Sequence, residues 1–183
     1  MKNESSRTAA GDSAGEKART GKLGPLGPPP ASGPPKPWKR RLLAARINLY
    51  PPFLGAGVRV IRRAPDLASF DVRMDLTRLN KNLVGTHFGG SLYAMCDPFF
   101  MWILTEQLGP DYVVWDKAAK IRFWRPGRGT VWARFHIPED EVERVERGAE
   151  SGEPYEPTYK VRVLDDLGKI VAEVDKLLYV KRR

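Results

Sequence analysis

The spacing of apolar and polar residues changes along the chain and marks the first expected elements. Residues 39–50 place four aliphatic side chains among basic ones, which predicts a short amphipathic helix that ends at Pro51. Residues 58–60 and 70–74 then alternate between apolar and polar side chains, with turn-forming residues at 64–66. This alternation predicts an antiparallel hairpin with one face toward solvent.

The segment from Ser91 to Leu108 is apolar nearly all round and is followed by Gly109 and Pro110, which predicts one long buried helix. Charge pairs four residues apart in 139–148 predict a small surface helix. The strand-like period returns at 119–123, 131–137, 159–163 and 170–180. The expected fold class is therefore α+β, with a curved antiparallel sheet of about six strands and one central helix against it.

The most informative stretch for function is NLVGTHFGGSLYAMCD, residues 82–97. A loop leads through two glycines directly into the apolar helix, so the amides of Gly89, Gly90 and Ser91 have no acceptors within that helix. The positive end of the helix dipole adds to their attraction for a developing anion. Asp97 follows about two turns later in apolar surroundings, where an acid needs a partner or a function. The alternative interpretation is a helix start with glycines for close packing and an Asp that is hydrogen-bonded or faces solvent.

Length and composition favour one folded domain. The chain has 183 residues, of which 42% are hydrophobic. Residues 1–37 form a basic segment rich in Gly, Pro and Ser with few large apolar side chains, and they are expected to be a disordered tail that folding does not require. Residues 38–183 are expected to form the domain.

The formal net charge of +9 attracts phosphates of any origin, but the sequence lacks a zinc-finger spacing, an RNP-like motif or a long basic helix. Charge for solubility, or an anionic small-molecule partner, is expected rather than nucleic acid. The single cysteine, Cys96, excludes an intrachain disulfide and fits a reducing cytoplasm. Neither a secretory signal nor an apolar run long enough to span a membrane is expected.

The order of elements and the pattern Asn-x-x-Gly-x-x-x-Gly-Gly, followed by an acid on the central helix, resemble the hotdog-fold acyl-CoA thioesterases of the phenylacetate-pathway type. The chain is most similar to a poorly characterised branch described as tetrameric acyl-CoA thioesterases. The resemblance spans residues 40–180 and includes DPFFMWIL, VWDKAAKIRFWRPG and VAEVDKLLYVKR. It implies six strands wrapped around the central helix, hydrolysis of acyl-CoA and a homodimer or homotetramer. It implies no cofactor other than the coenzyme A of the substrate, and no metal.

The resemblance also implies a catalytic set. Asn82, Gly85, Gly89, Gly90 and Asp97 match the positions of the family's site. Asp97 would act as general base or nucleophile, the Gly90 N–H as oxyanion donor, and Asn82 would orient the water or the thioester. The remaining candidates for substrate binding are Gly85, His87, Phe88, Gly89, Ser91, Arg122 and Arg125.

The chain departs from the family at one position, because Phe88 stands where the family has its histidine and His87 is displaced by one residue. His87 is therefore expected to be a loop residue. Arg122 and Arg125 would meet the phosphates of coenzyme A or be ordinary strand charges.

Two other functions stay open. A protein that binds acyl-CoA or lipid without catalysis would explain the missing histidine. A hotdog hydratase or dehydratase would need a histidine opposite Asp97, which neither His87 nor His136 evidently provides.

Overall fold

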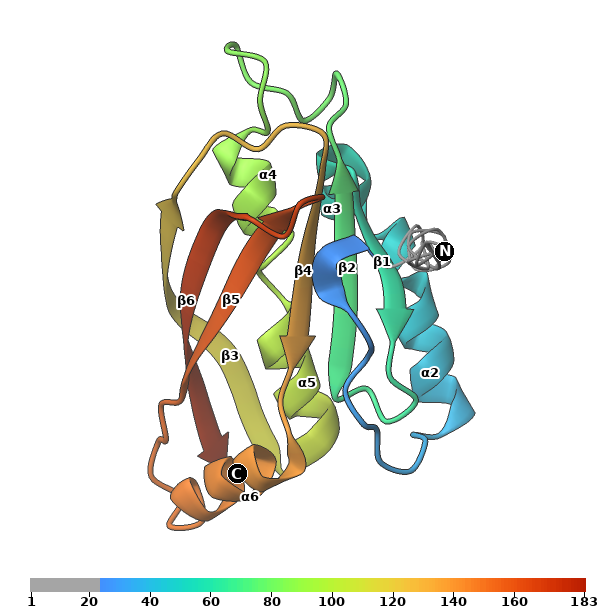
Figure 1. Cartoon of the computed structure of the whole chain (residues 1–183). Coiled ribbons are helices and arrows are strands. Elements are labelled where there is room, and N and C mark those ends of the chain that lie inside the picture. The colour runs from blue at the N-terminus through green and yellow to red at the C-terminus, as the bar shows by residue number, and fades with distance from the viewer. Residues whose placement is uncertain (1–23) are drawn as a thin grey trace, which may run out of the picture.

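Six antiparallel strands in the order β1-β2-β4-β5-β6-β3 form the single sheet of this computed structural model, which describes residues 24–183 (Figure 1). The strands are β1 (Val58–Arg63), β2 (Ser69–Asp75), β3 (Tyr112–Phe123), β4 (Thr130–His136), β5 (Thr158–Asp165) and β6 (Ile170–Arg182). The fold class and the strand count that the sequence predicts are confirmed.

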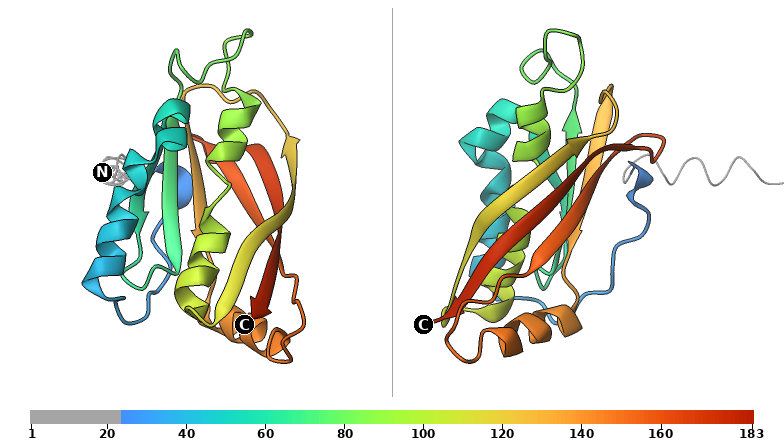
Figure 2. Two further views of the ribbon diagram at one scale, coloured as in Figure 1. Left: turned by 180° about the vertical axis from the view of Figure 1, so that it is seen from behind. Right: turned by 90° about the vertical axis from the view of Figure 1, so that its left-hand side faces the viewer.

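Most helices pack on one side of this sheet or at one end of it, whereas the short 3₁₀ helix near the start of the described chain lies on the opposite side, against Trp132 (Figures 1 and 2). The helices are η2 (Gly24–Leu26), α2 (Trp38–Ala45), η3 (Arg46–Leu49), α3 (Pro51–Ala56), α4 (Gly89–Ala94), α5 (Phe99–Leu108) and α6 (Glu139–Gly148). The predicted amphipathic segment 39–50 is thus an α-helix that continues as a 3₁₀ turn. No helix in the described part of the chain is long and apolar enough to cross a membrane.

The central helix is broken, whereas the sequence pattern predicts a single helix from Ser91 to Leu108. The backbone tightens after α4, where the Cys96 N–H donates to Tyr93 O at 2.8 Å. Pro98 has no N–H to continue the ladder, and α5 begins directly after it, with the Trp102 N–H donating to Pro98 O. Asp97 therefore lies in the break between two helices.

The core forms where α5 meets the strands. The side chains of Phe99, Ile103 and Leu104 on α5 are fully buried, as are those of Phe70 on β2 and Phe135 on β4. The rings of Phe99 and Phe135 stack with centroids 4.6 Å apart. Burying a side chain of this size stabilises the folded state by about 1.5–3 kcal/mol relative to leaving it exposed. These contacts therefore hold α5 against the sheet.

Residues 24–37, which belong to the predicted tail, lie against the sheet. The Arg134 guanidinium donates to Gly27 O at 3.1 Å and to Pro28 O at 2.6 Å, and the Gly33 N–H donates to Asp66 Oδ2. The outward-facing Trp132 is only 4% exposed, and the backbone at Gly24 lies directly against its ring. The rest of the predicted tail, 1–23, lies outside the described residues.

Strand β3 is longer than the predicted 119–123 and lies at one edge of the sheet, paired only with β6 among the described strands. A bulge between Asp116 and Ala118 interrupts the register of this pair. Lys117, at the bulge, forms an ion pair with Glu156 at 2.5 Å. A twelve-residue edge strand is an available surface for pairing with another sheet.

Candidate functional site

The loop before α4 is held by Asn82. Its side-chain Oδ1 accepts from the N–H groups of Val84 and Thr86, and its Nδ2 donates to Thr86 Oγ1 at 2.9 Å and to His87 O at 3.3 Å. Gly85 has φ +82°, a conformation that favours glycine. The side-chain amide of Asn82 is predicted to orient water or substrate, but in this structure its hydrogen bonds are all made to residues of its own loop.

The His87 side chain is buried and forms a hydrogen bond within the fold. Its side chain is 3% exposed, and its Nε2 lies 2.9 Å from Gly129 O. Its Nδ1 has no hydrogen-bond partner among the described residues. Burial lowers the pKa of the imidazole, although the Gly129 carbonyl opposes this effect, so the ring is neutral near pH 7. These contacts agree with the expectation that His87 is a loop residue.

Helix α4 begins at the glycine pair, with Phe88 as its N-cap. The amides of Gly89 and Gly90 have no acceptor in the described chain, as the sequence predicts. The Ser91 amide differs, because it donates to Phe88 O at 3.0 Å. The Phe88 ring is 57% exposed and covers Gly90 so closely that a Cβ at Gly90 would lie 2.4 Å from the ring. Glycine is therefore required here for close approach.

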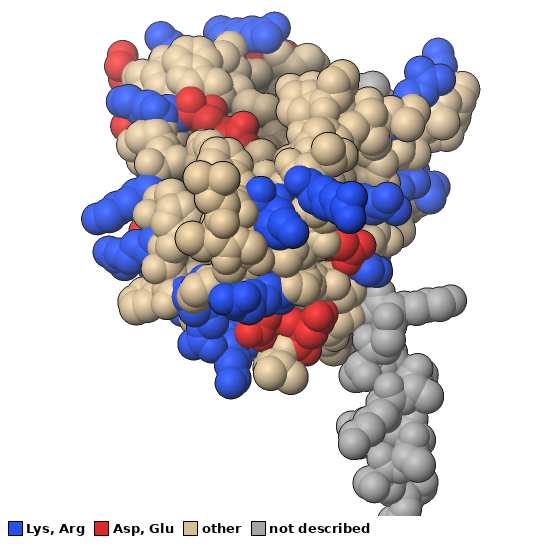
Figure 3. Space-filling model, turned by 90° about the horizontal axis from the view of Figure 1, so that it is seen from above, with Lys and Arg blue, Asp and Glu red and all other residues tan. Residues whose placement is uncertain are grey.

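A pocket of about 440 Å³ opens beside this loop. Its lining comes from the loop, from the start of α4 and from the β3–β4 connection: Asn82, Thr86, His87, Gly89, Leu92, Phe123, Trp124, Arg125, Pro126 and Gly127. The structure thus brings Asn82, His87, Gly89 and Arg125 together. Seen from above, Lys and Arg are spread over this end of the molecule among uncharged residues and a smaller number of Asp and Glu (Figure 3).

Asp97 lies elsewhere, in a cluster of charged groups under the helix break. Lys176 Nζ is 2.9 Å from Asp97 Oδ1, 3.1 Å from Asp116 Oδ1 and 3.3 Å from the Tyr93 hydroxyl. The Lys176 side chain is fully buried, whereas that of Asp97 is 48% exposed and that of Asp116 is 22% exposed. Lys176 therefore forms ion pairs with two carboxylates, of which that of Asp97 is the more exposed.

Burial and charge shift the pKa values in this cluster. Burial raises the pKa of Asp116 despite the opposing charge of Lys176. Burial alone would lower the pKa of Lys176, but the two carboxylates outweigh it and raise that pKa above its ordinary value. Burial raises the pKa of the neighbouring Cys96 thiol to about 12. Lys176 is thus a fixed cation, and Cys96 is an unreactive thiol.

Sequence reasoning missed Lys176, although the sequence carries a signal for it. In the final strand, Val174 and Leu178 face the core, and Lys176 lies between them at an inward-facing position. A lysine at such a position needs an anionic partner. Asp116, on β3, is the second anionic partner of Lys176.

The predicted catalytic set therefore splits into two places. Asp97 does not line the pocket: it lies beyond the C-terminal end of α4, whereas Gly89 begins that six-residue helix, which is about 9 Å long. Arg122 lies on exposed β3 opposite Glu173, away from the pocket lining. A base and an oxyanion donor must both lie about 3 Å from one reacting group, so these two places of a single chain cannot serve the same carbonyl.

Known structures share this architecture. A protein from Pseudomonas aeruginosa described as a probable thioesterase is 20% identical, with a TM-score of 0.67 over 81% of this chain and 98% of its own. A thioesterase from Haemophilus influenzae is 13% identical, with a TM-score of 0.56 over 78% of this chain and 90% of its own. The PaaI protein of the Escherichia coli phenylacetic acid degradation operon is 18% identical, with a TM-score of 0.53 over 80% of this chain and 92% of its own.

These similarities establish the class of fold: the chain is a hotdog domain like those of thioesterases. The model of a domain of unknown function, DUF4442, matches residues 39–180, so the chain belongs to that family. A search of curated proteins finds no match.

Proposed function

We propose that this protein hydrolyses acyl-CoA thioesters, with Asp97 as the group that activates water. The observation that carries the proposal is the half-exposed carboxylate at the break of the central helix, held on one side by a fully buried lysine. The partly exposed carboxylate can reach water, as a base that activates water requires. The hotdog fold shared with thioesterases supports the same reaction class.

The chemistry follows from the hydrogen bonds. Lys176 binds Oδ1 of Asp97, which fixes the plane of the carboxylate and leaves Oδ2 for a water molecule or the thioester. With Asp97 as base, Oδ2 takes a proton as the water attacks the carbonyl carbon. The C–S bond then breaks as Asp97 returns this proton to the departing sulfur, which releases the acid and the thiol of coenzyme A. The developing oxyanion would accept from a free amide at the start of α4, with Gly90 as the proposed donor.

Two copies of the chain would complete one site. Because the free amides and Asp97 are too far apart within one chain, we propose that Asp97 of one copy works with the glycine pair of a second. The long edge strand β3 offers the pairing surface. This strand lies next to the Lys176 cluster, because its Asp116 contacts Lys176. The expected assembly is a homodimer or homotetramer.

The pocket beside α4 would receive part of the substrate. Arg125 in its lining can donate to a phosphate of coenzyme A, and Leu92, Phe123 and Trp124 provide apolar surface. Arg122 lies on the same strand as Phe123 but outside this lining, so we assign it no contact with the substrate within one chain.

One observation favours a second function, the binding of acyl-CoA without hydrolysis. Phe88 covers Gly90 where the thioesterase family has its histidine, and His87 is buried with one ring nitrogen bonded to Gly129. A site of this kind would hold a thioester but lack a group to orient it for attack. A hydratase has less support, because neither described histidine contacts Asp97.

The test is hydrolysis of a panel of acyl-CoAs of different chain length, with the rate measured from the free thiol that is released. Equilibrium binding is measured on the same panel. Asp97→Asn should lower kcat by on the order of 10²–10⁴-fold and leave binding unchanged. Asp111→Asn, the same change at an exposed aspartate, is the matched control and should keep the wild-type rate. Binding without turnover by the wild type would establish the second function, and wild-type turnover by Asp97→Asn would refute the mechanism.

A further inference from the structure

The positive charge of the chain is concentrated in one segment. Residues 17–65 contain eleven Lys and Arg side chains and no Asp or Glu. The whole chain has 31 basic and 22 acidic residues, so the remainder has 20 basic and 22 acidic residues and is slightly negative. The net charge of +9 therefore originates from this segment alone, which in the described structure includes α2, η3, α3 and β1.

The same segment exposes large apolar side chains. Trp38 is 67% exposed, Leu42 47% and Leu49 69%. Helical spacing places Trp38, Leu42 and Arg46 on one face of the α2–η3 segment. The opposite face packs inward, because Arg40 bonds Glu106 of α5 at 2.8 Å. The outward face of this segment is thus a stripe of aromatic, aliphatic and basic side chains.

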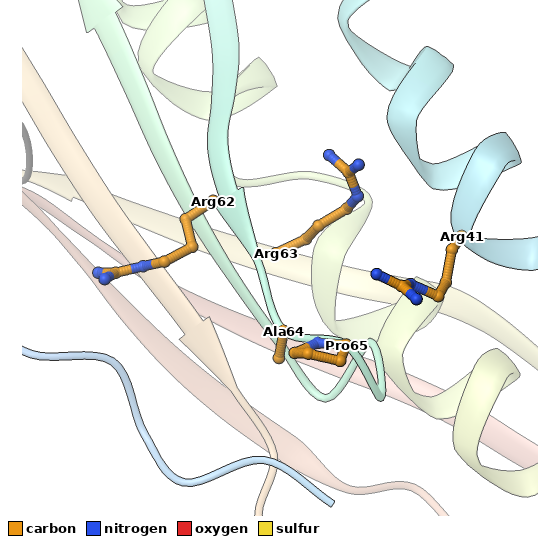
Figure 4. Close-up of a pocket in the computed structure, with 5 residues that line it drawn as sticks. All are labelled: Arg41, Arg62, Arg63, Ala64 and Pro65. Carbon is orange, nitrogen blue, oxygen red and sulfur yellow. The ribbon is translucent and has the colours of Figure 1, made fainter. Parts of the chain in front are cut away.

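Two arginines beside this stripe lack acidic partners. Arg41 on α2 and Arg63 at the end of β1 extend into the space between these elements and line a pocket of about 260 Å³ (Figure 4). Arg62, also in the lining, points away and is paired with Asp71. No carboxylate lines the pocket, and neither Arg41 nor Arg63 forms an ion pair in the described residues. The pocket is open and has room for a phosphate group.

We propose that this face, formed by Trp38, Lys39, Arg41, Leu42, Arg46, Leu49 and Arg63 and called here the basic face, binds the surface of membranes that contain anionic phospholipids. The apolar side chains would enter the boundary between headgroups and acyl chains while the cations remain among the lipid phosphates. Tryptophan favours this boundary, because its ring is apolar and its N–H is polar. The Arg41–Arg63 pocket would hold one lipid phosphate between two guanidinium groups.

Charge and apolar surface together favour an anionic membrane over a second copy of the chain or a nucleic acid. A symmetric contact between two copies would bring the basic face against itself, and like charges would oppose that contact. A nucleic acid would neutralise the arginines but leave Leu42 and Leu49 without an apolar environment. An anionic membrane satisfies the cations and the apolar side chains together, and this inference does not depend on the proposed hydrolysis.

The experiment is co-sedimentation of the full chain with vesicles of phosphatidylcholine alone or of phosphatidylcholine mixed with phosphatidylglycerol. We expect binding to the mixed vesicles that weakens as salt is added. The double variant Arg41→Gln/Arg63→Gln should reduce partitioning by about 30-fold, since each cation near an anionic surface contributes a factor of about five. The control Arg147→Gln/Lys169→Gln removes the same charge from other surfaces and should change partitioning much less.

A second pair of variants tests the apolar part. Leu42→Ser/Leu49→Ser should weaken binding to mixed vesicles, whereas Leu167→Ser, at a more exposed leucine of the β5–β6 turn, should not. Circular dichroism of each variant confirms that its fold is kept. Equal binding to both kinds of vesicle, an equal effect of the charge control, or no vesicle binding at all would overturn the proposal. If Leu42→Ser/Leu49→Ser instead changed the sedimenting mass, the face would be a contact between copies.

Discussion

Replacing Lys176 by Met removes the cation from the Asp97–Asp116 cluster while keeping most of its apolar stem. Lys176 is fully buried and lies within 3.1 Å of both carboxylates. Removing one partner of a buried ion pair costs roughly 3–5 kcal/mol, whereas exposed pairs contribute about 0–1 kcal/mol. Since Asp97 is half exposed and can be hydrated, we expect the free energy of unfolding to fall by about 2–4 kcal/mol at neutral pH.

The loss should depend on pH. Burial raises the pKa of Asp116, and without Lys176 to oppose it this pKa rises further. A carboxyl whose pKa is raised in the folded state destabilises the fold above its unfolded pKa of about 4 and has no such effect below it. The pKa of Lys176 is also raised, so its stabilising contribution in the wild type is fully present throughout the neutral range and is lost only at alkaline pH. The difference between wild type and variant should therefore be largest near neutral pH and shrink toward pH 4.

Urea denaturation followed by circular dichroism at neutral and acidic pH measures this difference. Lys169→Met, the same change at an exposed lysine, is the control and should cost less than about 0.5 kcal/mol. A variant as stable as the wild type at neutral pH would refute the argument. A loss of the same size at every pH would show that Lys176 acts through packing and not through its charge.

The remaining predictions concern other parts of the fold. Deletion of residues 1–23 should leave the melting temperature unchanged. Deletion of 1–37 should lower the free energy of unfolding by about 2–3 kcal/mol, because it exposes Trp132 and breaks the hydrogen bonds of Arg134 to residues 27 and 28. Thermal denaturation of both deletion variants and the full chain measures the difference. Cys96 should resist alkylation at pH 8 until urea unfolds the chain, since its thiol is buried with a pKa near 12; mass spectrometry with and without urea reports this. His87→Ala should cost about 1–3 kcal/mol of stability and lower kcat far less than Asp97→Asn; steady-state kinetics with a denaturation curve separates the two effects. Sedimentation at micromolar concentration should show a dimer or a tetramer, and a stable monomer would remove the proposed composite site.

The sequence by itself determined the architecture, because the signals of the strands and helices are local. The alternation in 131–137 predicts which side chains of β4 face the core, and Val131, Ala133 and Phe135 are all fully buried there. The charge pattern predicts α6 with the bounds observed, Glu139–Gly148. The glycine pair predicts free amides at the start of α4, and the structure leaves those of Gly89 and Gly90 without acceptors among the described residues.

Only the tertiary structure decided how the charged groups are arranged. Asp97 and Lys176 are 79 residues apart in the sequence, and the pairing of β3 with β6 beneath the helix break brings them and Asp116 together. No local pattern reports such a distant contact, just as none shows that residues 24–28 cover Trp132.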